Sequence, residues 1–226
     1  MTQTETIVHL LRHGEVHNPE GVLYGRRDGF HLSDLGNQMA QRVAESIGDR
    51  DITHLRVSPL ERAQETARPL AAARGLEIVT DERVIESANK LEGLSFDQGL
   101  WSIVKRPRIW RHFYNPLRPS WGEAHDAIVT RMMAAVEDAR AAAEGHEAVI
   151  VSHQLPIWTT RLHVEKRRQN IDPRKRECTL CSLTSLHFTG DRIARVAYSE
   201  PAGDLIPVKD RNAPFSAGNA PEEKRP

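Results

Sequence analysis

Short apolar segments alternate with longer segments of helical periodicity along this 226-residue chain, and this alternation limits the folds open to it. Strands that alternate with helices favour an α/β fold, here a three-layer sandwich whose mostly parallel central sheet carries helices on both faces. The predicted strands are 7–11, 52–57, 77–80 and 148–151, of which the first and the last are expected to be buried. The predicted helices are 34–47, 59–74, 123–143 and 154–164. Two further strands, 182–188 and 193–198, flank a turn signal and predict a hairpin.

The chain divides into one predicted domain and a tail. Residues 1–208 read as a single catalytic domain, because no linker-like stretch interrupts them. Within this domain, residues 96–121 are aromatic, basic and without a clear period, so we interpret them as a lid-like insert. Residues 209–226 are polar and rich in proline, glycine and charge, which predicts a disordered tail.

Composition argues against several classes of partner. Lys plus Arg and Asp plus Glu both number 31, so net charge supplies no argument for binding a nucleic acid or a membrane. No run approaches the roughly 18 apolar residues that a membrane helix needs, and we expect a soluble cytoplasmic protein. The two cysteines, Cys178 and Cys181, support no disulfide framework. They are expected to be core residues, with half of a zinc site as the alternative.

Arginine and histidine residues lie directly after several of the predicted strands. Arg12 and His13 come directly after the first strand, and His153 comes after the strand 148–151. Arg62 lies near the start of the helix that follows the second strand. Because the carboxyl ends of parallel strands open onto one side of a sheet, these side chains are expected to converge.

Such a site suits phosphoryl transfer. The guanidinium groups of arginine bind phosphate oxygens and stay charged, and a neutral imidazole is a competent nucleophile. Phosphoryl transfer demands mainly positioning and charge stabilisation, together with an acid that protonates the leaving oxygen. No metal-binding or nucleotide-binding motif is present, so we expect no cofactor and no metal.

Four segments in order resemble the motifs of the histidine phosphatase superfamily, whose best-known branch is the cofactor-dependent phosphoglycerate mutases. They are Leu-Arg-His-Gly-Glu at 11–15, Leu-Ser-Asp-Leu-Gly at 32–36, Ser-Pro-Leu-Glu-Arg-Ala-Gln-Glu-Thr-Ala at 58–67 and Val-Ile-Val-Ser-His at 149–153. The resemblance implies a phosphoglycerate mutase-like fold. It also implies that His13 is transiently phosphorylated, while Arg12, Arg62 and His153 bind the phosphoryl oxygens.

Two further roles follow from the resemblance alone. Glu86 resembles the acid that protonates the leaving group and later activates water. Asn18 resembles a phosphate-contacting asparagine, although its spacing from the first motif is one residue short. The implied activity is that of a metal-independent phosphomonoester hydrolase of the histidine acid type, which acts on a phosphorylated small molecule.

Three readings stay open. In the preferred one, water cleaves the phosphoenzyme and the protein is a phosphatase. In the second, the phosphoryl group returns to the substrate and the protein is a mutase; against it, Glu86 is followed by Ser-Ala-Asn-Lys where the mutase branch has Arg-His-Tyr-Gly. The third is a non-catalytic protein that binds a phosphorylated ligand. The sequence does not indicate the substrate, the oligomeric state or the role of the basic segment 161–176.

Overall fold

The structure, a computed structural model, describes residues 5–90, 92–93, 122–168 and 176–207. The predicted lid-like insert and the predicted tail lie outside these residues.

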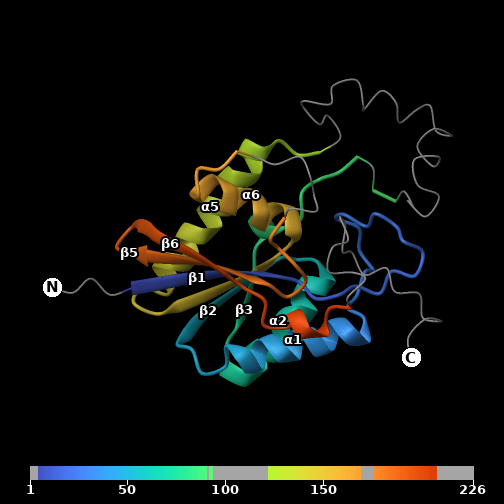
Figure 1. Cartoon of the computed structure of the whole chain (residues 1–226), viewed down its shortest axis with the longest axis horizontal. Coiled ribbons are helices and arrows are strands. Elements are labelled where there is room, and N and C mark those ends of the chain that lie inside the picture. The colour runs from blue at the N-terminus through green and yellow to red at the C-terminus, as the bar shows by residue number, and fades with distance from the viewer. Residues whose placement is uncertain (1–4, 91, 94–121, 169–175, 208–226) are drawn as a thin grey trace.

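A six-stranded sheet forms the centre of the molecule, in the order β3-β2-β4-β1-β5-β6 (Figure 1). The strands are β1 (Glu5–Arg12), β2 (Ile52–Val57), β3 (Ile78–Thr80), β4 (Glu147–Ser152), β5 (Leu183–Thr189) and β6 (Arg192–Ser199). The first four pair in parallel, and β5 runs antiparallel to both β1 and β6. This confirms the α/β class, the mostly parallel sheet and the C-terminal hairpin.

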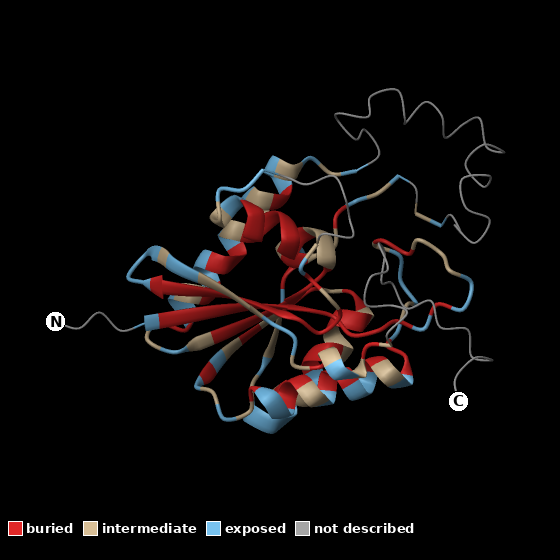
Figure 2. Cartoon of the chain, in the orientation of Figure 1, coloured by how far each residue is buried: buried red, intermediate tan, exposed pale blue. Residues whose placement is uncertain are grey.

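Helices cover both faces of the sheet, as predicted. Helices α1 (Asp34–Ser46) and α2 (Glu61–Arg74) lie on one face, and α5 (His125–Ala142) and α6 (Gln154–Val164) lie on the other (Figure 1). Two short 3-10 turns are η1 (Glu82–Val84) and η3 (Gly203–Leu205). Burial is concentrated in the central strands and on the sheet-facing sides of the helices (Figure 2). No helix within the described ranges has the length and apolar character needed to cross a bilayer.

Local sequence signals explain where the helices begin and end. The Ser33 hydroxyl accepts the backbone N–H of Gly36 at 3.0 Å and caps α1, as its position predicted. Gly75 ends α2 in the left-handed conformation, with φ of 63°. The predicted helix 59–74 begins two residues later than expected, at Glu61, because Leu60 is still extended.

Candidate active site

The predicted polar residues meet where β1, β2 and β4 end. The His13 backbone N–H donates to the Ser152 carbonyl at 3.1 Å, and the Ser58 N–H donates to the Val151 carbonyl at 3.0 Å. The chain therefore continues the sheet ladder beyond the strand ends. This brings the rings of His13 and His153 together, with their centroids 5.1 Å apart.

His13 is buried, and its ring is fixed by its own loop. Its Nδ1 lies 2.8 Å from the carbonyl oxygen of Gly14, so Nδ1 carries the proton and Nε2 keeps its lone pair. Burial lowers the pKa of His13 well below its ordinary value, and the charges of Arg62 and Arg12 lower it further. The imidazole is therefore neutral near pH 7 and able to act as a nucleophile.

His153 faces the same space from the start of α6. Its Nε2 lies 2.7 Å from the Ser58 hydroxyl, whereas its buried Nδ1 has no hydrogen-bond partner among the residues that the structure describes. Burial and the charge of Arg62 hold its pKa well below the ordinary value. Ser58 was not predicted as a site residue, although it lies inside the arginine motif.

The two predicted arginines are held by backbone carbonyls. Arg62 is completely buried, and its Nη2 donates to the Gly25 carbonyl at 2.6 Å. Its Nε and Nη1 have no hydrogen-bond partner within the described ranges, and its guanidinium lies 4.7 Å from the ring centroid of Tyr24. Arg12 donates from Nη1 to the Cys178 carbonyl at 2.8 Å. Because a buried guanidinium with open N–H groups is costly, Arg62 is suited to bind an anion.

Close backbone packing fixes the loop that carries His13. A Cβ on Gly14 would lie 2.7 Å from the Gly36 carbonyl oxygen, and one on Gly36 would lie 2.0 Å from the Glu15 carbonyl oxygen. Only glycine fits at either position, which explains the glycines of the first two motifs. Thr66 ties this loop to the Arg62 helix, because its hydroxyl accepts the Gly14 N–H at 3.0 Å and donates to the Arg62 carbonyl at 2.6 Å. Thr66 was missed, although its spacing of four from Arg62 places both on one helix face.

Glu86 belongs to the same charged environment. Its Oε1 accepts the Ser87 N–H at 2.7 Å, and the residue is of intermediate exposure. Burial of its carboxyl raises the pKa of Glu86, while the positive charges of Arg62, Arg12 and Arg131 oppose that rise. A carboxyl whose pKa is raised in this way is suited to donate a proton.

An ion-pair network holds the backbone on both sides of Glu86. Arg131 donates from Nη1 to the carbonyls of Arg83 and Ile85, at 2.6 and 2.7 Å. Arg26 donates from Nε to the carbonyl of Glu86 itself, at 2.6 Å. Both guanidinium groups also bind the Glu123 carboxylate, at 2.8–3.1 Å.

Asn18 is buried, and its amide is used within its own loop. Its Nδ2 donates to the Val22 carbonyl at 2.8 Å, and its Oδ1 accepts the Val22 N–H at 3.1 Å. Within the described residues, these contacts use one of the two amide hydrogens of Asn18.

The cysteines are free thiols in separate parts of the core. Cys181 packs in the hydrophobic cluster beneath α1 and α2, and Cys178 packs in the cluster on the other face. Burial raises the pKa of Cys178 to about 11 and that of Cys181 to about 12. This placement fits the expectation of core residues. In the described ranges, no three His, Cys, Asp or Glu side chains are grouped to hold a metal ion.

Sequence comparisons place the chain among known proteins. The profile of the histidine phosphatase superfamily (branch 1) matches residues 8–201. Uncharacterized protein Rv0525 of Mycobacterium tuberculosis is 52% identical over 200 residues, which cover 88% of this chain and 98% of that protein. A probable phosphoglycerate mutase GpmB of an Enterobacter species is 33% identical over 156 residues, covering 66% and 70%.

Solved structures share the fold at lower identity. YhfR of Bacillus stearothermophilus superposes with a TM-score of 0.69 at 24% identity, covering 89% of this chain and all of that one. A mycobacterial glucosyl-3-phosphoglycerate phosphatase superposes at 0.64 with 22% identity, covering 86% and 96%. The phosphoserine phosphatase of Entamoeba histolytica, solved with 3-phosphoglyceric acid, also gives 0.64 at 22% identity, covering 87% and 99%.

Proposed function

Because the chain belongs to the histidine phosphatase superfamily, we propose that it hydrolyses phosphomonoesters through a phosphohistidine intermediate on His13, without a metal ion. The observation that carries the proposal is the state of the His13 ring. Nδ1 is committed to the Gly14 carbonyl at 2.8 Å and the pKa is low, so a neutral ring presents Nε2 beside an enclosed arginine.

The reaction has two steps. In the first, Nε2 of His13 attacks phosphorus and the bond to the ester oxygen breaks, while Glu86 gives its proton to the leaving alcohol. In the second, the Glu86 carboxylate takes a proton from water, and the oxygen of that water displaces Nε2 from phosphorus. Phosphate leaves, and both His13 and Glu86 return to their starting states.

Arg12, Arg62 and His153 are assigned to the phosphoryl oxygens. The open N–H groups of Arg62 suit a fork of oxygen acceptors, and the enclosure of the site strengthens each charge interaction. Asn18 is assigned to the same group through the amide hydrogen that Val22 leaves free. The ion-pair network of Arg26, Glu123 and Arg131 holds Glu86 in place for its two proton transfers.

The proposed substrate is a phosphorylated small molecule. Proteins with the same fold are named for glucosyl-3-phosphoglycerate and phosphoserine, which supports this class. A second function, phosphoglycerate mutase activity, is favoured by the relative named as a probable phosphoglycerate mutase. The hydrolase and mutase reactions differ in whether water or a hydroxyl group of the substrate accepts the phosphoryl group.

The deciding experiment measures phosphate release from a panel of phosphomonoesters with EDTA present, for the wild type and His13→Ala. The panel includes 3-phosphoglycerate with and without 2,3-bisphosphoglycerate, and isomers are followed. We expect release by the wild type only, and EDTA should leave its rate unchanged. An undiminished rate in His13→Ala would refute the mechanism. Isomerisation without release would favour the mutase, and a strict metal requirement would contradict metal independence.

A further inference from the structure

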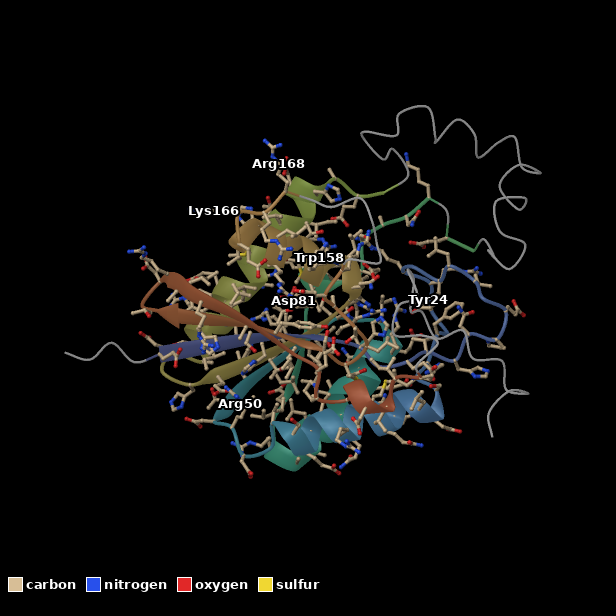
Figure 3. The ribbon with its side chains drawn as sticks, in the orientation of Figure 1. Tyr24, Arg50, Asp81, Trp158, Lys166 and Arg168 are labelled. Carbon is tan, nitrogen blue, oxygen red and sulfur yellow. The ribbon has the colours of Figure 1, made fainter. Side chains whose placement is uncertain are left out.

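The described basic residues of segment 161–176 have three kinds of surroundings. Arg161 binds the carboxylates of Glu165 and Glu177, at 2.9 and 2.6 Å. Lys166 and Arg168 are exposed, and both project from the end of α6 into solvent (Figure 3). Arg176 differs from all of these. Its Nε is enclosed, and no hydrogen-bond partner for that atom occurs in the described part of the chain.

Arg176 belongs to a segment that lines the candidate site. Two residues later, the Cys178 carbonyl accepts Nη1 of Arg12 at 2.8 Å. The Cys181 N–H then donates to the His13 carbonyl at 3.4 Å. Residues 176–181 therefore run directly beside the nucleophile loop. The charges of Glu86 and Arg12 both act on Arg176, in keeping with the place of this segment beside the site.

Among the residues that the structure describes, Arg176 forms no ion pair with a carboxylate. Glu86 is the carboxylate whose charge interacts with Arg176, and in the first step of the proposed reaction Glu86 must carry a proton. A phosphoryl dianion is matched by Arg12 and Arg62. Arg176 is then a third, partly enclosed guanidinium in the segment that lines the site, and desolvated arginine favours carboxylate or phosphate oxygens.

We propose that Arg176 binds a second anionic group on the leaving part of the substrate, a carboxylate or a second phosphate. Preferred substrates then carry this group in addition to the phosphoryl group that is transferred. The inference rests on the proposed phosphatase function and gives it a substrate class.

Matched substrates test the inference. Glycerol 3-phosphate and 3-phosphoglycerate differ at one carbon, which is a hydroxymethyl group in the first and a carboxylate in the second. An alkanediol bisphosphate and its monophosphate form the corresponding phosphate pair. For each pair, the ratio of kcat/KM values isolates recognition of the second anion. Comparing the two pairs then distinguishes a carboxylate from a phosphate.

The proteins are the full-length wild type, Arg176→Gln, Arg176→Lys and the matched control Arg168→Gln. We expect the wild type to favour one of the substrates with a second anionic group at least tenfold, and Arg176→Gln to lower that ratio about tenfold or more, mainly through KM. Arg176→Lys should retain part of the preference, and Arg168→Gln all of it. A wild-type ratio near one, or equal losses by Arg176→Gln on both members of each pair, would overturn the inference.

A failure of the phosphatase proposal is distinguishable from a failure of this inference. If no His13-dependent release occurs, calorimetric binding of the same pairs to His13→Ala, with and without Arg176→Gln, still reports on Arg176. We expect the member with the second anionic group to bind more tightly than its partner, and Arg176→Gln to abolish this difference. If Arg176→Gln leaves the binding of both members of each pair unchanged, Arg176 does not bind a second anionic group.

Discussion

Two polar clusters lie at opposite ends of the β1–β4 pair, and they differ in how completely the hydrogen bonds of their buried atoms are made. At the start of β4, Glu147 accepts from His9 at 2.8 Å and from Arg50 at 2.6 and 2.9 Å. The other nitrogen of His9 pairs with the Ser185 hydroxyl at 2.7 Å. None of the buried side-chain atoms of this cluster lacks a partner.

At the other end, the cluster of Arg12, His13, Arg62 and His153 is left open. Buried atoms of Arg62 and His153 have no partner among the described residues. Figure 3 shows the separation, with Arg50 and Tyr24 toward opposite ends of the sheet. A satisfied network stabilises the fold, whereas an open one costs stability until a ligand completes it. The difference therefore separates a structural cluster from a binding one, although both contain histidine, arginine and carboxylate or hydroxyl groups.

Arg62→Met should have the largest effect. Methionine keeps much of the volume but removes the charge that we propose binds the phosphoryl group, so kcat/KM should fall roughly a thousandfold or more. The free energy of unfolding should rise by about 1 kcal/mol, because an incompletely paired buried charge is removed. Urea titration measures the free energy of unfolding, and phosphate-release assays on the same sample measure kcat/KM. A marked loss of stability would mean that Arg62 is structural and would break the comparison.

Glu86→Gln should lower kcat for alkyl phosphates by about 10²- to 10⁴-fold. The loss should be much smaller for p-nitrophenyl phosphate, because its leaving group departs without a proton. Equal losses on both substrates would contradict the role of Glu86 as an acid.

The pH dependence of kcat/KM for the wild type tests the protonation states that the mechanism assigns to Glu86 and His13. The first step needs protonated Glu86, whose pKa is raised, so kcat/KM falls as the pH rises through that pKa. It also needs neutral His13, whose pKa is lowered, so activity persists into acid and is lost as the pH falls through the low pKa of His13. The optimum should therefore lie on the acid side of neutrality. An alkaline optimum would contradict this assignment.

Glu147→Gln should lower stability and preserve catalysis, which is the opposite of the result expected for Arg62→Met. Burial raises the pKa of Glu147, but the hydrogen bonds from His9 and Arg50 outweigh this and lower it from 4.5 to about 2. The variant should lose roughly 2 kcal/mol of stability at pH 7, with catalysis preserved. Because the pKa of Glu147 is lower in the folded state, the full stabilisation is present above pH 4.5 and is lost as the pH falls toward 2. Glu137→Gln, which removes an exposed pair with Arg140, is the matched control and should change stability little.

Among the variants at the candidate site, Glu123→Gln should have the smallest effect on catalysis, a loss in kcat of about threefold to tenfold. The substitution leaves the charge of Arg131 uncompensated, and Arg131 lowers the pKa of Glu86. The alkaline limb of the pH profile should therefore move to lower pH. A loss of activity with no shift of that limb would mean that Glu123 acts only through folding.

Much of this arrangement could be read from the chain. The strand ends alone indicated that His13, His153 and Arg62 converge, because parallel strands open onto one edge. Glu86 was found only through resemblance, since a carboxylate in an irregular segment gives no periodic signal. The network behind it was missed because Arg26 and Glu123 are 97 positions apart, and no local pattern pairs them. The cluster of His9, Arg50 and Glu147 was missed for the same reason.

The contact between Gly14 and Gly36 has a consequence for how this protein can change. Two backbones that touch without intervening side chains leave no room for adjustment, so the loop of His13 and helix α1 behave as one rigid unit. Under the proposed function, the floor of the site is therefore a fixed template for the phosphoryl group. Adaptation to a new substrate has to occur at the rim, where side chains such as Arg176 can be exchanged without moving the template.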